Sequence, residues 1–213
     1  MKTDDLIRAL AADDLQIDPT QAERRFFGKL AAGAMIAVAA MLLLMGTRAD
    51  LNTAAFTAMF WMKLLFPASL AVAALAALRR LSYPGMRLGR VPAAAALPLA
   101  LVWMMAGLAL SAAPAGERLA LVLGETWIEC PFNIALLSVP ALGLAFWATR
   151  GLAPTRLSLA GAAAGLFAGA VAALAYALHC PEMQAPFLAV WYGFGMLIPT
   201  GAGALLGRRI LNW

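Results

Sequence analysis

The side chains best suited to chemistry stand beside two Cys-Pro pairs. Glu129 precedes Cys130 in the first, and His179 precedes Cys180 in the second; these are the only two cysteines and the only histidine of the chain. Thiolate, imidazole and carboxylate groups bind soft or borderline metal ions such as zinc, copper or cadmium. We therefore predict a signal-sensing site at Cys130, Cys180, Glu129 and His179, with Cys130, Cys180 and His179 as the hypothetical metal ligands.

The same two thiols have other interpretations. A disulfide between Cys130 and Cys180 would close a loop of about 50 residues and stabilise the fold by up to about 4 kcal/mol. Two small side chains buried at helix ends are a further alternative. Thiol redox catalysis is disfavoured, since the chain has no CxxC pair. A structural role and a sensing role both stay open at this point.

The composition identifies the elements that must position these residues. Of 213 residues, 63% are hydrophobic and 13% are charged, with a mean hydropathy of +0.82. Soluble domains have about 45–50% apolar and about 25% charged residues. The chain is therefore not an ordinary soluble protein, a disordered chain or a disulfide-rich secreted domain. Its net charge of +5 does not indicate direct nucleic-acid binding, because basic residues gather on the cytoplasmic side of membrane proteins.

Six apolar stretches follow a polar start. They lie at about 26–47, 55–78, 91–113, 128–149, 157–179 and 186–206. Each is close to the roughly 20 residues that a membrane-spanning helix needs, and in lipid the backbone must satisfy its own hydrogen bonds. We predict an all-α integral membrane protein with six transmembrane helices, divided into a cytoplasmic tail (1–25) and a bundle (26–213). The first stretch is too long for a signal peptide and is predicted to be an uncleaved span.

Lysine and arginine residues predict the orientation. They gather in the tail, the second and fourth loops and the C-terminus, at Lys2, Arg8, Arg24, Arg25, Arg79, Arg80, Arg87, Arg90, Arg150, Arg156, Arg208 and Arg209. The opposite loops hold only Arg48 and Arg118. Because basic loops stay in the cytoplasm, both termini are predicted to be cytoplasmic, and the cysteines lie at the outer face.

Lys63 falls inside the second stretch. A charge within a span is by default a functional hypothesis. We favour a simpler interpretation, in which Phe60, Trp61 and Lys63 form an interfacial belt and the lysine snorkels to the outer surface.

Glycines at four-residue spacing occur on the last two stretches. They are Gly161, Gly165 and Gly169, followed by Gly203 and Gly207. Such faces allow close backbone contact in lipid. Packing within the bundle is the favoured interpretation, and dimerisation is the alternative.

The tail is predicted to form an acidic amphipathic helix. Leu6, Ile7 and Leu10 recur at helical spacing, and Asp4 and Asp5 lie in the first turn. So short a helix is marginal alone in water, and its negative charge opposes binding to an anionic lipid surface. Its apolar stripe suits a groove on a basic protein, or alternatively the basic loops of its own bundle.

Several functions lack the residues they need. The chain has no Ser/His/Asp set, HExxH motif or phosphate-binding loop, and its spans carry no deep acidic residue. Lys63 and Asn133 are the only polar hints of a small metal- or thiol-linked transporter, which is the main alternative function. A membrane thiol oxidoreductase is a third interpretation, but it would need a second reactive cysteine pair or a bound quinone.

The opening MKTDDLIRALAADD, the six spans and the two outer Cys-Pro pairs resemble the NrsF family, which are negative regulators of sigma F. The resemblance covers essentially the whole chain. It implies a multi-pass protein of the bacterial inner membrane that is an anti-sigma factor and not an enzyme, with no resident cofactor. The family implies that an extracytoplasmic-function sigma factor is held at the lipid bilayer until an envelope signal releases it.

The resemblance also implies roles for particular residues. Heavy-metal ions, bound transiently, and oxidative stress are the signals linked to the family, and its outer cysteines correspond to Cys130 and Cys180. The tail motif corresponds to Thr3, Asp4, Asp5, Leu6, Ile7 and Leu10, which would bind the sigma factor. Glu129, His179 and Lys63 have no role assigned by the resemblance.

Overall fold

The computed structural model describes Thr3 and residues 19–212, and in these residues every regular element is helical. Six helical segments are long and apolar enough to span a membrane. They are α2 (Pro19–Leu44), α4 (Ala58–Ser82), α5 (Val91–Ala112), α7 (Glu129–Arg150), α8 (Leu157–Tyr176), and a sixth composed of α9 (Ala185–Phe187), the π-helical turn η1 (Leu188–Tyr192) and α10 (Gly193–Ile210). Two short helices, α3 (Leu51–Ala54) and α6 (Arg118–Leu123), lie in loops.

The six predicted long apolar helices are confirmed, but several of their boundaries differ. The first helix begins at Pro19, so the predicted division at residue 25 falls inside α2. Proline suits a first helical position because its ring sets φ and its missing N–H needs no partner there. The second span begins at Ala58, later than predicted, because the Thr57 hydroxyl caps it by accepting a hydrogen bond from Phe60 N at 3.4 Å.

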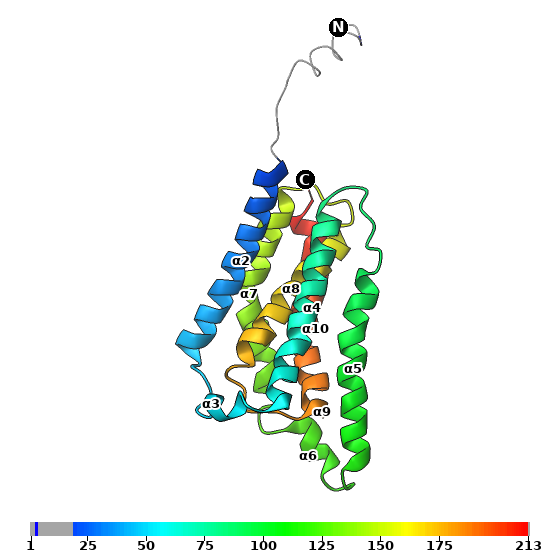
Figure 1. Ribbon diagram of the computed structural model, residues 1–213. Helices are drawn as coiled ribbons and strands as arrows, with labels where there is room; N and C mark the ends of the chain where they lie inside the picture. Colours follow the sequence, from blue (N-terminus) through cyan, green and yellow to red (C-terminus); the bar gives the residue numbers. More distant parts are fainter. Residues whose placement is uncertain (1–2, 4–18, 213) are drawn as a thin grey trace.

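The bundle has two distinct ends (Figure 1). The start of α2 and the end of α10 lie together at one end, named here the terminal end. The short helices α3, α6 and α9 lie at the other. Cys130 lies in the first turn of α7, and Cys180 precedes α9; this second end is named the cysteine end.

Helix α8 is the centre of the bundle. It packs against α10, α4, α7 and α2 and is the most buried of the six spans. Helix α5 is the least buried, and it stands at the edge of the bundle beside α4 (Figure 1). The residues around the two cysteines are therefore built on the tightly packed part of the molecule.

The glycines of α8 and α10 face one another and form what we call the glycine seam. A Cβ added to Gly161 would lie 2.1 Å from Gly203 O, and one added to Gly165 would lie 2.0 Å from Pro199 O. The two backbones touch, which only glycine permits. The interpretation as packing within the bundle is confirmed.

The glycine seam predicts a steric effect. Gly165→Ala should destabilise the protein by about 1–3 kcal/mol, since the added methyl group meets backbone rather than a movable side chain. Thermal unfolding in detergent micelles measures this. Gly201→Ala in α10 is the matched control, because its Cβ would meet nothing within 4 Å. Equal melting temperatures for the two variants would contradict the description of the seam.

Candidate functional site

Residues 178–184, named here the Cys180 segment, join α8 to α9 without forming a helix. After Tyr176 the chain turns, with His179 N and Cys180 N both donating to Tyr176 O at 3.0 Å. Pro181 follows, and its ring prevents the helix from continuing. The remaining carbonyls of the segment are thus free to accept hydrogen bonds from other parts of the chain.

Lys63 of α4 supplies the most buried of these bonds. Its Nζ donates to Cys180 O at 2.6 Å and to Glu182 O at 2.7 Å. The side chain is fully buried, and Nζ lies 5.5 Å from the centroid of the Tyr192 ring. The lysine therefore ties the N-terminal end of α4 to the Cys180 segment.

The predicted interfacial belt is wrong for Lys63. Trp61 is 56% exposed, as a belt requires, but Phe60 and Lys63 are buried. The reason is that the Cys180 segment covers the N-terminal end of α4, and its carbonyl groups accept the hydrogen bonds that water would otherwise accept from Lys63. One sequence signal points this way: Lys63 shares a helical face with Phe60 and Leu70, at the three- and seven-residue spacings of a buried stripe.

The loop between α2 and α3 binds the same segment. Arg48 N donates to Leu178 O at 3.0 Å, and its Nη1 donates to Cys180 O at 3.3 Å. His179 Nδ1 lies 3.0 Å from Gly46 O. Arg48 is held in place by its ion pair with Asp50 at 2.6 Å, and the hydrogen bond from Arg48 lowers the pKa of the Asp50 carboxyl.

The connection between α5 and α7 binds it from another side. Glu125 N donates to Glu182 Oε1 at 2.7 Å. Gly124 allows this contact, because its φ is 57° and a Cβ there would lie 2.7 Å from the Glu182 carboxyl carbon. Trp191 Nε1 also donates to Val122 O at 2.8 Å. Both other loops at the cysteine end are therefore fastened to the α8–α9 connection.

Cys130 and Cys180 are free thiols, and both are fully buried. Their side chains lie next to each other. The neighbouring Cys130 thiol, as a hydrogen-bond donor, lowers the pKa of the Cys180 thiol. The charge of Lys63 and the backbone N–H of Glu182 act in the same direction, while burial opposes them. Of the states left open by the sequence, the structure has two neighbouring thiols.

The other predicted site residues do not join the thiols in a metal site. Glu129 is exposed at the start of α7, and the His179 ring lies against Tyr176 with centroids 5.6 Å apart. In residues 19–212, no group of three or more His, Cys, Asp or Glu side chains is arranged to hold a metal ion. The predicted partner-binding residues Asp4, Asp5, Leu6, Ile7 and Leu10 lie outside the described residues.

Sequence reasoning missed two residues of this site. Arg48 and Tyr192 contact or face the cysteines, yet neither was proposed as a member. They come from two different segments, the α2–α3 loop and η1, and nothing local marks them. Their shared role depends on how the loops fold over the end of α4.

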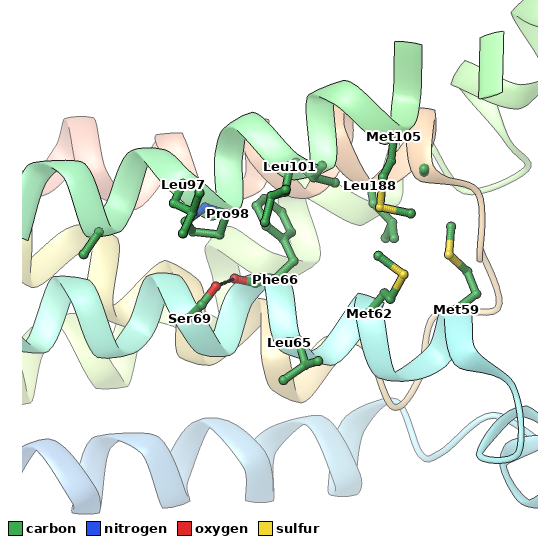
Figure 2. Close-up of a pocket in the computed structure, with 13 residues that line it drawn as sticks. Met59, Met62, Leu65, Phe66, Ser69, Leu97, Pro98, Leu101, Met105 and Leu188 are labelled. Atoms are coloured by element: carbon green, nitrogen blue, oxygen red, sulfur yellow. Dashed lines mark hydrogen bonds between the residues drawn. The ribbon is translucent and has the colours of Figure 1, made fainter. Parts of the chain in front are cut away.

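A cavity of about 370 Å³ lies between α4 and α5 and is lined almost entirely by apolar side chains (Figure 2). Met59, Met62 and Met105 lie toward one end, and Ser69 supplies a hydroxyl that is already donated to Phe66 O at 2.8 Å. A carrier of polar substrates needs polar groups at mid-depth. The lining of this cavity does not favour the transporter alternative.

Comparison with known proteins gives a full-length match. The family described as "Negative regulator of sigma F" matches residues 10–213. The chain belongs to this family, NrsF. The probable anti-sigma-F factor NrsF of Azospira oryzae is 46% identical over 213 residues, and the anti-sigma-F factor NrsF of Caulobacter vibrioides is 41% identical over 220 residues. Each match covers 100% of both chains. No solved structure matches this chain.

The bonds of Lys63 predict a loss of stability on replacement. Lys63→Met should lower the free energy of unfolding by about 1–3 kcal/mol, because carbonyls in a covered site lose their donor. Chemical unfolding in detergent measures the change. Lys29→Met is the matched control, since Lys29 makes one long bond of 3.4 Å to Trp147 O at an exposed position. A cost for Lys63→Met no larger than for Lys29→Met would contradict the role of Lys63 in the structure.

Proposed function

We propose that this NrsF-family protein is an anti-sigma factor of the bacterial inner membrane that sequesters an extracytoplasmic-function sigma factor. It releases the sigma factor when a heavy-metal or oxidative signal reaches Cys130 and Cys180 in the periplasm. The observation that carries the proposal is the full-length similarity to two anti-sigma-F factors. On this proposal the protein acts by binding and release and not by catalysis.

The distribution of charge supports the proposed orientation. Exposed arginines lie on the segments that meet at the terminal end, at Arg24, Arg25, Arg87, Arg90, Arg150, Arg156, Arg208 and Arg209. Arginine-rich loops are retained in the cytoplasm. The terminal end is then cytoplasmic, where a sigma factor is found, and the cysteine end faces the periplasm.

The tail is the proposed binding element for the sigma factor. Leu6, Ile7 and Leu10 supply apolar anchors at the spacing with which an amphipathic helix fills a groove. Asp4 and Asp5 add negative charge, which complements the basic surface of a protein that binds DNA. The membrane bundle then acts as the tether.

Release requires that the two ends be coupled. The Cys180 segment lies directly between α8 and the α9–η1–α10 span, and these two spans touch at the glycine seam. A chemical change at the thiols would bias this helix pair between two arrangements and alter how the terminal end presents the tail. Such coupling needs a two-state element, which the helix pair supplies in this proposal.

The tail predicts a loss of binding on charge insertion. The double variant Leu6→Asp, Leu10→Asp should weaken sigma-factor binding by about a hundredfold or more, since it removes two buried leucines. Co-purification from gently solubilised membranes and a reporter of the regulon measure this. The matched control is Ala12→Asp, Gln16→Asp, which adds the same charge to the opposite face of the predicted helix. Retention of the sigma factor by the leucine variant would exclude the tail as the binding element.

The thiols predict a separate phenotype. Replacement of both Cys130 and Cys180 by serine should abolish the response of the regulon to cadmium or peroxide. The variant should still co-purify the sigma factor, because its tail is intact, and this serves as the internal control. A dose response identical to that of the unaltered protein would rule out sensing at these cysteines.

A further inference from the structure

The ammonium group of Lys63 is buried without a carboxylate partner. No ion pair among residues 19–212 includes Lys63, and its two hydrogen bonds go to neutral carbonyls. A buried cation is costly unless an opposite charge lies nearby. The acidic group next to it is the thiol of Cys180, which belongs to the residue whose carbonyl Lys63 binds.

We propose that Lys63 is a positioning residue that holds Cys180 as a thiolate, so that Cys180 reacts first with electrophiles while Cys130 serves as its hydrogen-bond donor. The inference deepens the proposed function, on which it rests for the biological meaning of the reaction. It assigns different roles to two cysteines that look equivalent in the sequence.

The hydroxyl of Tyr192 is a second observation that points to a thiolate. Tyr192 is fully buried, and its Oη has no hydrogen-bond partner among the described residues. The hydroxyl faces the Cys180 side chain. A neutral thiol accepts hydrogen bonds weakly, whereas a thiolate accepts them strongly. Ionisation of Cys180 would give this orphaned donor an acceptor.

The π-helical turn η1 explains how Tyr192 reaches this position. The turn covers Leu188–Tyr192, and its wider backbone changes the direction of the side chains that follow from a regular helix. Turns of this kind often occur at functional sites. Here the turn brings the hydroxyl of Tyr192 to the cysteines.

Groups from every neighbouring element surround Cys180. They are Lys63 from α4, Arg48 from the α2–α3 loop, Cys130 from α7, Tyr176 from α8, Tyr192 from η1, and Glu182 from the segment itself. Two of them, Lys63 and Arg48, are cations that donate to the Cys180 carbonyl. Glu182 directs its backbone N–H at the sulfur and its carboxylate away, toward Glu125 N. These positive charges and hydrogen-bond donors around Cys180 favour a negative charge on its sulfur.

The two cysteines differ in the cations that bind their backbone: Lys63 and Arg48 both donate to the carbonyl of Cys180. Cys130 stands in the first turn of α7, and in this proposal its thiol is the donor to the Cys180 thiolate. Thiolates, not thiols, are the nucleophiles, so the asymmetry makes Cys180 the attacking group.

The test measures the reactivity of Cys180 alone. In a Cys130→Ser background, the serine hydroxyl keeps a donor at position 130, and Cys180 is the single remaining thiol. The probe is methyl methanethiosulfonate. The Cys180 thiolate attacks its sulfenyl sulfur, a new S–S bond forms, the bond between the two reagent sulfurs breaks, and methanesulfinate leaves with the electron pair. The rate is measured from about pH 5 to about pH 9 by mass spectrometry of protein in detergent.

The midpoint of the rate-against-pH curve reports how readily Cys180 ionises to the thiolate. The plateau of the rate at high pH reports how often the site opens to the reagent. We expect the midpoint of the parent to lie well below the value of about 8.5 of an ordinary cysteine. Lys63→Gln keeps donors for the two carbonyls but removes the charge. It should raise the midpoint by about one unit or more, which slows the reaction about tenfold at pH 6.

Control variants separate charge from structure. Lys63→Arg should keep the low midpoint, Lys29→Met should leave it unchanged, and Tyr192→Phe should raise it without removing the ring. If Lys63→Gln does not fold, Tyr192→Phe is judged in its place, and an unshifted midpoint in Tyr192→Phe overturns the inference.

An unshifted midpoint in Lys63→Gln would overturn the inference, even if the plateau changes, because Lys63 would then be only a structural tie. The assay contains no sigma factor. A shifted midpoint in a protein that binds no sigma factor would therefore refute the proposed function and leave the inference intact.

Discussion

A buried ammonium group is the constraint on which the cysteine end of the molecule depends. Lys63 lies too deep under the loops to reach water, so carbonyl groups must converge on it. The Cys180 segment provides two of them, and it can do so only in its non-helical form. The conformation that satisfies the lysine is thus the one that sets Cys180 beside Cys130.

The other two loops of the cysteine end both bind the same segment. Arg48 reaches it from the first connection, and Glu125 reaches it from the third. The segment also lies between the two spans that touch at the glycine seam. A glycine contact between backbones has no flexible side chains to absorb a displacement. A change at Cys180 is therefore expected to move helices as well as loops, which is the physical basis of the proposed release.

The sequence predicted the six spans because length and apolar composition are local properties of each stretch. It also predicted the glycine packing, since four-residue spacing places Gly161 and Gly165 on one face. It did not predict the burial of Lys63, because that burial depends on contacts with Cys180 and Glu182, which lie 117 and 119 residues farther along the chain. The position of the His179 ring depends on a distant contact for a related reason: His179 is adjacent to Cys180 in sequence, but its ring turns to Gly46.

We expect the Cys180 segment to hold the other loops at the cysteine end, so that a change at its thiol releases them. Two backbone amides report on this directly, because Arg48 N donates to Leu178 O and Glu125 N donates to Glu182 Oε1. Their hydrogen exchange can be compared in lipid nanodiscs before and after Cys180 is methylthiolated in the Cys130→Ser variant. The account predicts faster exchange at both amides after modification. Unchanged protection at both would contradict it.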